Sequence, residues 1–247
     1  MGSNPIGSDR CRSWVHDVHE QLCRRLTKAI HEPFRPVGLG SERDPRTDNC
    51  PLPFPLTGEG PRAQVRPLVR GGDVVLSADA GADMFLNPDG SSRTFNAERF
   101  VAAVTGDFSL SAFVSPVFVS DFDSGVLIGY IDPLNWFKVC AELDPSGTSR
   151  VVSVVTRDGV SDDCDSWPID RSGTFLRISR LGRAFAMHAS VDGHRWSMVR
   201  YFAMGDPAPV GVEIGFAAQS PSGKGTTATF SGISFDSHRL TGVRDGS

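Results

Sequence analysis

The sequence predicts an all-β protein, a sandwich of two antiparallel sheets, preceded by a helix and a proline-rich arm. Three observations favour this class. From about residue 73 onward, short runs alternate apolar and polar side chains with the period of a half-buried β-strand. Stretches rich in turn-forming residues separate these runs. No helical pattern falls between them, which favours two packed sheets over alternating strands and helices.

The first element expected is an amphipathic helix at residues 9–31, within an N-terminal region of residues 1–31. Its apolar side chains recur at helical spacing, Ser8 or Asp9 can cap its start, and Pro33 follows its end. Residues 32–72 are expected to form a proline-rich linker or wrapping arm. Eight of the 17 prolines lie between residues 32 and 70, so this segment cannot hold a helix or a central strand.

The sandwich itself is expected over residues 73–237, followed by a tail at 238–247. Asp192-Gly193 suits a tight hairpin turn within it. The expected strands lie near residues 74–77, 100–104, 108–118, 126–131, 136–143, 149–156, 174–180, 184–190, 196–202, 210–219 and 226–235.

Composition excludes several classes of function. A net charge of −4 gives no clustered basic surface for nucleic acid. No apolar run approaches the roughly 18–20 residues that span a bilayer, and the N-terminus lacks the apolar core of a secretory signal. We therefore expect a cytoplasmic protein without a membrane partner. Five cysteines without short paired spacing indicate reduced thiols.

The run "NWFKVCAEL" at residues 135–143 indicates a strand with one unusual face. Phe137 and Val139 belong to an apolar face that suits the core. The opposite face carries an indole, an ammonium group and a carboxylate, from Trp136, Lys138 and Glu142. This combination is neither a typical core nor a typical wet surface, so we interpret it as part of a binding face.

Alternation in neighbouring runs predicts further members of the same groove. The expected ligand-binding residues are Trp136, Lys138, Glu142, Arg157, Arg177, His188 and Gln219. An aromatic ring can stack on a sugar, and charged groups can form hydrogen bonds with its hydroxyl groups. The alternative is a solvated sheet face, on which a cross-strand Lys–Glu pair stabilises the fold by well under ~1 kcal/mol.

Several consecutive blocks then show a family resemblance. The segments "GDFSLSAFVSP", "DSGVLIGYIDPLNWFKVCAEL", "FLRISRLGRAFAMHASVDGHRWSMVR" and "VGVEIGFAAQSPSGKG" occur in this order within residues 75–235. They resemble the concanavalin A-like domain-of-unknown-function family that includes the yeast regulator-of-enolase protein. The resemblance implies a lectin/glucanase-type jelly roll whose concave face binds sugar. Cys140 and His188 depart from it, since relatives usually carry a glycine and an aromatic residue there.

The same groove could host catalysis. Lys138 and Glu142 are candidate acid–base groups, and His188 titrates near neutral pH. Concanavalin A-like glucanases typically supply their carboxylates from one strand as E-x-D-x-x-E, a motif that does not occur here. An elimination, isomerisation or cyclisation in specialised or sugar metabolism stays open.

No cofactor or metal is expected. We expect acidic loops at residues 121–125 and 161–166. They could bind calcium but lack the spacing of an EF-hand, and aspartate is common in turns. His16, His19 and Cys23 could hold zinc, although a polar helix flank explains them better.

Three functions follow, in order of preference. The first is lectin-like binding of a carbohydrate or glycosylated small molecule on the concave face. The second is an enzyme that uses the same groove. The third is a regulatory protein-interaction module, with helix 9–31 docking on a protein partner.

Overall fold

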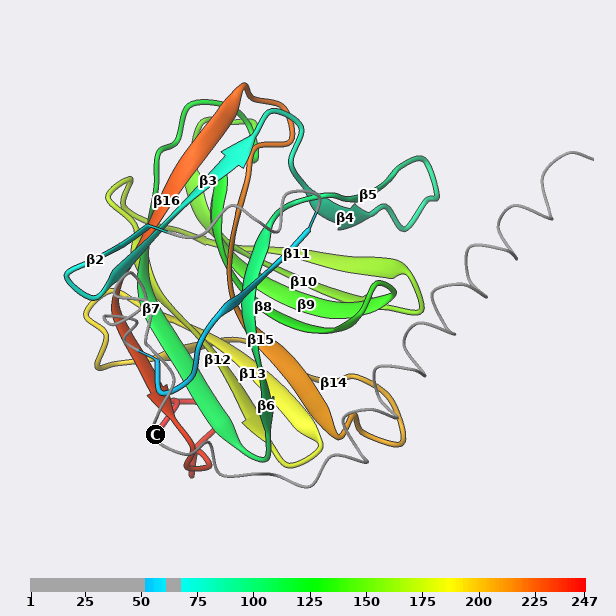
Figure 1. Cartoon of the computed structure of the whole chain (residues 1–247), viewed down its shortest axis with the longest axis vertical. Coiled ribbons are helices and arrows are strands. Elements are labelled where there is room, and N and C mark those ends of the chain that lie inside the picture. The colour runs from blue at the N-terminus through cyan, green and yellow to red at the C-terminus, as the bar shows by residue number, and fades with distance from the viewer. Residues whose placement is uncertain (1–51, 61–67) are drawn as a thin grey trace, which may run out of the picture. The chain divides into compact units, whose positions relative to one another are not determined.

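The computed structural model describes residues 52–60 and 68–247. In these ranges the chain forms sixteen β-strands and no α-helix, which confirms the expected all-β class (Figure 1). Two antiparallel seven-stranded sheets and one two-stranded sheet account for all the strands. The expected helix at 9–31 lies outside the described residues. Within them, no helix is long and apolar enough to cross a membrane.

Sheet A contains the strand from which the site is built. Its strand order is β1-β6-β15-β8-β9-β10-β11. The strands span Thr57–Glu59 (β1), Arg99–Thr105 (β6), Gly211–Gln219 (β15), Ser124–Asp132 (β8), Asn135–Leu143 (β9), Ser149–Arg157 (β10) and Val160–Pro168 (β11).

Sheet B packs against sheet A with the order β14-β13-β12-β7-β16-β3-β2. Its strands span Ser197–Ala203 (β14), Ala184–Ser190 (β13), Thr174–Leu181 (β12), Phe108–Pro116 (β7), Gly225–Asp236 (β16), Asp73–Asp79 (β3) and Leu68–Arg70 (β2). The small third sheet is a hairpin of β4 (Met84–Leu86) and β5 (Arg93–Phe95).

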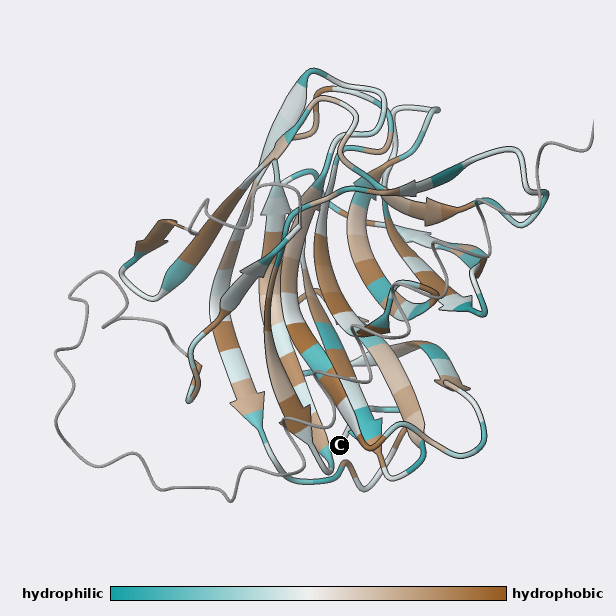
Figure 2. Ribbon diagram, turned by 45° about the vertical axis from the view of Figure 1, so that its right-hand side comes forward, coloured by the Kyte–Doolittle hydropathy of each residue, from teal (hydrophilic) through white to brown (hydrophobic). Residues whose placement is uncertain are grey.

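The core lies between the two large sheets and is rich in phenylalanine. Phe137 of β9 lies with its ring centroid 4.8 Å from that of Phe185 in β13, and Phe216 of β15 lies 4.9 Å from Phe230 in β16. All four rings are fully buried, and each such burial stabilises the fold by roughly 1.5–3 kcal/mol. Apolar and polar bands alternate along the strands in Figure 2, as the period of two requires.

All eleven expected strands are present, and five further strands were not predicted. Of these, β1 and β2 come from the described part of the proline-rich arm. Both are three-residue edge strands, one in each large sheet. Edge positions tolerate the sparse backbone pairing of a proline-rich segment, so the arm contributes to the sandwich before residue 73.

Strand β11 was mistaken for an acidic loop at residues 161–166. Its sequence lacks an apolar face because it is the edge strand of sheet A, and backbone pairing with β10 holds it in place. The turn before it is the tight Asp-Gly hairpin, since Asp158 and Gly159 have φ of 51° and 76°. The expected hairpin at Asp192-Gly193 is instead part of a longer loop between β13 and β14.

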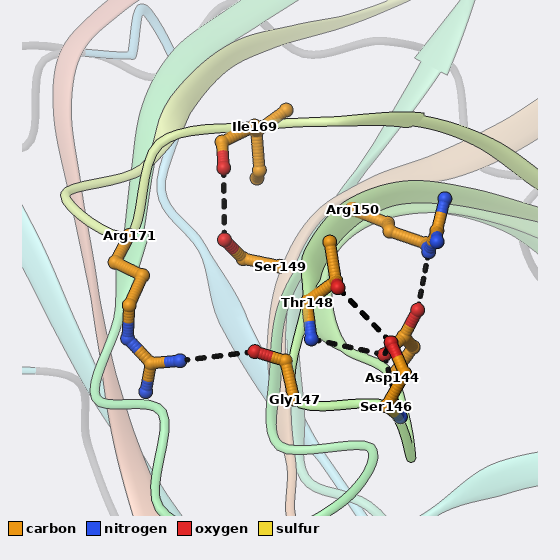
Figure 3. A network of polar contacts seen from close by, with 8 residues as sticks. All are labelled: Asp144, Ser146, Gly147, Thr148, Ser149, Arg150, Ile169 and Arg171. Atoms are coloured by element: carbon orange, nitrogen blue, oxygen red, sulfur yellow. Dashed lines mark hydrogen bonds and ion pairs between the residues drawn. The ribbon is translucent and has the colours of Figure 1, made fainter.

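The turn between β9 and β10 is fixed by one carboxylate (Figure 3). Asp144 Oδ1 accepts hydrogen bonds from Ser146 N at 2.8 Å and Thr148 N at 3.0 Å, while Arg150 Nε donates to Asp144 Oδ2. The bond from Arg150 and that from Ser146 hold the pKa of Asp144 well below its usual range. Arg171 Nη1 donates to Gly147 O at 3.4 Å, which ties this turn to the loop before β12.

Candidate functional site

Strand β9 turns two different faces to its surroundings, as the alternation predicts. Phe137 points toward sheet B, so Trp136 and Lys138 point away from it. We call the side of sheet A that points away from sheet B the outer face. By strand register, its members include Arg99 of β6, Gln219 of β15, Tyr130 of β8, Trp136, Lys138, Cys140 and Glu142 of β9, and Asp163 and Asp165 of β11.

The β4–β5 hairpin covers part of this outer face. The Phe95 ring lies 5.9 Å from both Tyr130 and Trp136, measured between centroids. Leu86 N donates to Ser161 Oγ at 3.0 Å, which ties β4 to β11. Trp136 is fully buried as a result. The expectation that its indole stacks on a sugar is therefore corrected: the ring is buried and already packs against Phe95.

An arginine completes this covered region. The Arg99 guanidinium lies 4.8 Å from the Phe95 centroid and 4.5 Å from the Tyr130 centroid, so it is held by two aromatic faces. Burial lowers the pKa of Arg99 and raises the pKa of Tyr130 to about 12. This half of the outer face is closed and aromatic.

The other half is organised around a buried ammonium group. Lys138 is only 3% exposed, and its Nζ donates to Gln219 Oε1 at 3.0 Å. Gln219 Nε2 in turn donates to Asp83 Oδ1. Burial alone would lower the pKa of Lys138, but Cys140 and the nearby carboxylates Asp83, Glu142 and Asp163 outweigh that effect and raise it. Lys138 is therefore charged at neutral pH.

The carboxylates beside Lys138 connect it to solvent. Glu142 and Asp83 are half-buried, and Asp163 is exposed. Burial raises the pKa of Glu142 to about 8, although Lys138 lowers it, and burial also raises the pKa of Asp163. At pH 7 the cluster thus offers an ammonium donor, a largely protonated carboxyl group and further acceptors.

Sequence reasoning missed two members of this cluster, Asp83 and Asp163. Asp83 precedes the short strand β4, and no local pattern connects it with β9. Asp163 belongs to the stretch that was read as a loop. The stretch "SDDCD" carries no clear signal for a strand, because Asp162 on the opposite side is acidic as well and polar residues do not alternate with apolar ones.

Arg157 does not join the outer face. Its strand neighbour Val155 pairs with Phe137, so Arg157 shares the side of β10 that points toward sheet B. Its Nε donates to Ala203 O at 2.8 Å, and its guanidinium lies 6.0 Å from the Phe202 centroid. The grouping of Arg157 with Lys138 was therefore wrong, because the run containing it was assigned the opposite phase.

Arg177 and His188 belong to the other sheet. They pair with each other across β12 and β13, on the side of sheet B that points away from sheet A. Val243 O lies 2.7 Å from His188 Nε2, and Gly246 O accepts from Arg177 Nη2 at 2.8 Å. Burial lowers the pKa of His188 to about 4. The structure therefore separates His188 from Lys138 and Glu142, with which it was expected to act.

The acidic stretch 121–125, a candidate calcium site in the sequence, contains a carboxylate that is hydrogen-bonded within the protein. Asp123, in the stretch 121–125, is fully buried and accepts from Val119 N, Ser120 N and Ser220 Oγ at 3.0, 2.8 and 2.6 Å. Among the described residues, no group of three or more His, Cys, Asp or Glu side chains is placed to hold a metal ion. His16, His19 and Cys23 lie outside those residues.

Cys140, the remaining outer-face residue of β9, is a buried thiol. Burial raises the pKa of the Cys140 thiol, which keeps it protonated.

The chain matches one family model over most of its length. A family model described as a protein of unknown function, DUF1349, matches residues 63–238. No curated protein sequence matches significantly. A functionally unknown protein from Saccharomyces cerevisiae has a similar solved structure, with 22% identity and a TM-score of 0.64. The match covers 73% of this chain and 95% of the yeast protein.

Parts of larger enzymes share the same fold. A xylan β-1,4-xylosidase from Bacillus halodurans matches with 15% identity and a TM-score of 0.59, over 83% of this chain and 41% of the enzyme. The GH43 protein BlXynB from Bacillus licheniformis matches with 16% identity and a TM-score of 0.55, over 68% of this chain and 34% of the enzyme. At these identities the likeness concerns the fold.

Proposed function

The chain belongs to the DUF1349 family, and because that family is one of unknown function, we propose from the geometry that this protein binds a carbohydrate or glycosylated small molecule. The binding site is the half of the outer face of sheet A around Lys138. The two-sheet sandwich that it shares with parts of sugar-active enzymes fits such a role.

The observation that carries the proposal is the buried, charged Lys138, which donates to Gln219 and lies near partly exposed acidic side chains that raise its pKa. Its donor lies near the acceptors of Asp83, Glu142 and Asp163, next to the half of the outer face that the aromatic side chains close. Sugar hydroxyl groups are both donors and acceptors, so they can bind such a mixed set. Stacking by Trp136 plays no part, because its ring is buried.

The test is a calorimetric and thermal-shift titration with xylose, xylobiose and a panel of neutral glycosides. We expect saturable binding that Asp163→Asn weakens about tenfold, as loss of a charge-assisted hydrogen bond does, and that Glu142→Leu weakens by a similar factor because it removes both the donor and the acceptor of the protonated carboxyl group. Asp162→Asn is the matched control, since Asp162 neighbours Asp163 but its carboxylate lies 3.3 Å from Arg200 Nη2 of β14. Binding that ignores both site variants, or no binding across the panel, would overturn the proposal.

A second candidate function rests on a separate observation. Burial raises the pKa of Glu142 to about 8 against the opposing effect of Lys138, so the carboxyl group is largely protonated at pH 7 and can donate its proton as a general acid. An elimination, isomerisation or cyclisation of the bound sugar would then slow as the pH rises through about 8, because Glu142 loses the proton that it donates. Turnover of a panel compound by Glu142→Gln at the wild-type rate would refute this role.

A further inference from the structure

Two buried polar side chains, Arg177 and His188, lie on the side of sheet B that points away from sheet A, and so on the opposite side of the sandwich from Lys138. Arg177 is 7% exposed and His188 is fully buried, and the two are direct cross-strand partners. Residues 243–246 lie over them through two backbone carbonyl groups, from Val243 and Gly246. Trp196 covers the guanidinium, with 4.2 Å between the Arg177 Cζ and the ring centroid.

On one edge of the Arg177 guanidinium, only one of the two N–H donors has a hydrogen-bond partner among the described residues. Its Nε and Nη2 form one edge of the planar fork, the edge that binds both oxygens of a carboxylate or phosphate. Nη2 donates to the single carbonyl oxygen of Gly246 at 2.8 Å. The buried Nε has no hydrogen-bond partner among the described residues. This edge therefore contacts one neutral carbonyl oxygen, although its two donors could bind two oxygens of an anion.

The surroundings of Arg177 also lack a balancing negative charge. Burial lowers its pKa to about 10, with no carboxylate acting in the other direction. Asp245 lies near enough to influence His188, but its Oδ1 accepts from Ser247 N and Ser247 Oγ at 3.2 and 3.0 Å. A buried cation without an anionic partner is unfavourable, so an anion that reaches it gains free energy.

We propose that Arg177 and His188 form an oxyanion-binding site on sheet B, which takes a carboxylate or phosphate group when residues 243–246 leave it. The donors are Arg177 Nε, which has no partner among the described residues, and Arg177 Nη2 and His188 Nε2, which now contact the carbonyl groups of the tail. The Trp196 ring packs on the guanidinium and keeps the fork oriented. The tail and the anion compete for the same donors.

Gly246 provides a way to open the site. Its φ of 68° and the close approach of its backbone leave no room for a side chain. A Cβ built on it would lie 1.8 Å from Arg177 Nη2 and 2.9 Å from Trp196 Cβ. Gly246→Ala therefore cannot keep the carbonyl of residue 246 on the guanidinium, and the tail has to move away from the donors.

The experiment is calorimetric titration of the full chain with inorganic phosphate and, separately, with acetate. Gly246→Ala should bind phosphate or acetate about tenfold more tightly than wild type, because the competing carbonyl is removed. Adding Arg177→Gln to that variant should reduce the affinity about tenfold or more. Arg171→Gln is the matched control, since Arg171 also donates to carbonyl groups and lies over a ring, that of Phe118, but on the surface.

A second measurement uses wild type alone and does not depend on any variant folding. Thr241 N and Gly242 N donate to Ser247 O at 2.6 and 2.8 Å, so their hydrogen exchange reports on the closed tail. Phosphate or acetate should accelerate this exchange. If neither anion does so, or if the double variant binds as tightly as Gly246→Ala, the proposal is overturned. The anion with the larger effect identifies which oxyanion the site prefers.

Discussion

Lys138 Nζ and Gln219 Oε1 are joined by a 3.0 Å hydrogen bond between residues 81 positions apart. The bond links β9 to β15 over the intervening strand β8. Lys138 is 3% and Gln219 1% exposed, so neither can turn to water if the other is lost. This bond and the acidic groups around it are the basis of the first two predictions.

Replacing Lys138 should cost stability as well as binding. Lys138→Met leaves Gln219 Oε1 without its donor and the neighbouring carboxylates without their cation, which we expect to destabilise the fold by about 3 kcal/mol. Urea unfolding at pH 7 measures this, with Lys224→Met as the control because Lys224 is exposed. A midpoint equal to that of the control would show that the ammonium is not held as described.

Glu142 should make the protein less stable as the pH rises from about 5 to 8. Its carboxyl pKa is raised to about 8 by burial, so the folded state binds a proton that the unfolded state has released. The free energy of unfolding therefore falls through this window, by about 1.4 kcal/mol for each unit of pKa shift. Glu142→Gln should flatten this part of the stability curve, as measured by urea unfolding at several pH values. An unchanged slope would contradict the shift.

His188 should act in the opposite direction at lower pH. Burial lowers its pKa to about 4, so between about pH 6.5 and 4 the unfolded state binds a proton that the folded state does not. The free energy of unfolding should therefore decrease as the pH falls through this range. Thermal unfolding of wild type and His188→Gln between pH 4 and 7 tests this. The two curves should converge toward low pH, and parallel curves would refute the prediction.

Replacing Gly129 with alanine should destabilise the protein, because the core has no room for an additional methyl group there. A Cβ on Gly129 would lie 2.1 Å from Phe137 Cζ, and that ring is itself packed against Phe185 and Phe202. Gly129→Ala should destabilise the fold by about 1–3 kcal/mol through overpacking. Gly211→Ala, whose Cβ meets nothing closer than 3.4 Å, is the control. Unfolding midpoints of the two variants are compared.

A double variant checks the cause. Adding Phe137→Leu to Gly129→Ala removes the ring atoms in conflict, so the two changes together should cost clearly less than the sum of their separate effects. Simple additivity would mean that Gly129 matters for another reason.

Asp123 should be required for the loops at one end of the sandwich. It is fully buried and satisfies two backbone N–H groups and the Ser220 hydroxyl. Asp123→Ala leaves three donors without an acceptor and should cost about 2–4 kcal/mol. Thermal unfolding against the exposed control Asp121→Ala provides the comparison. Equal melting temperatures would show that water replaces the carboxylate without loss.

The sequence predicted eleven of the twelve strands of seven or more residues, and the phase of β9, because both depend on a local pattern. Side chains in a strand alternate between two sides, so Phe137 and Lys138 had to face opposite ways wherever the strand was placed. The same reasoning failed for β11, since an edge strand needs no apolar face and its backbone pairing leaves no mark in the sequence.

The membership of the site was decided by contacts between distant segments. Asp83 reaches the Lys138 cluster through Gln219, and Phe95 closes over Trp136, although neither is near β9 in sequence. Arg177 and His188 each alternate with apolar neighbours along their own strands, but nothing in the local sequence shows to which sheet those strands belong.

By itself, then, the sequence determined that the protein is all-β, where most strands lie and which side chains of a strand share a face. Only the tertiary structure decided that Lys138 and Gln219 share a sheet while Arg177 and His188 lie on the other, and that the Trp136 ring is covered. The physical reason is that alternation reports the burial of a face, whereas strand order and the hairpin that covers a face depend on pairing and packing over long separations in the chain.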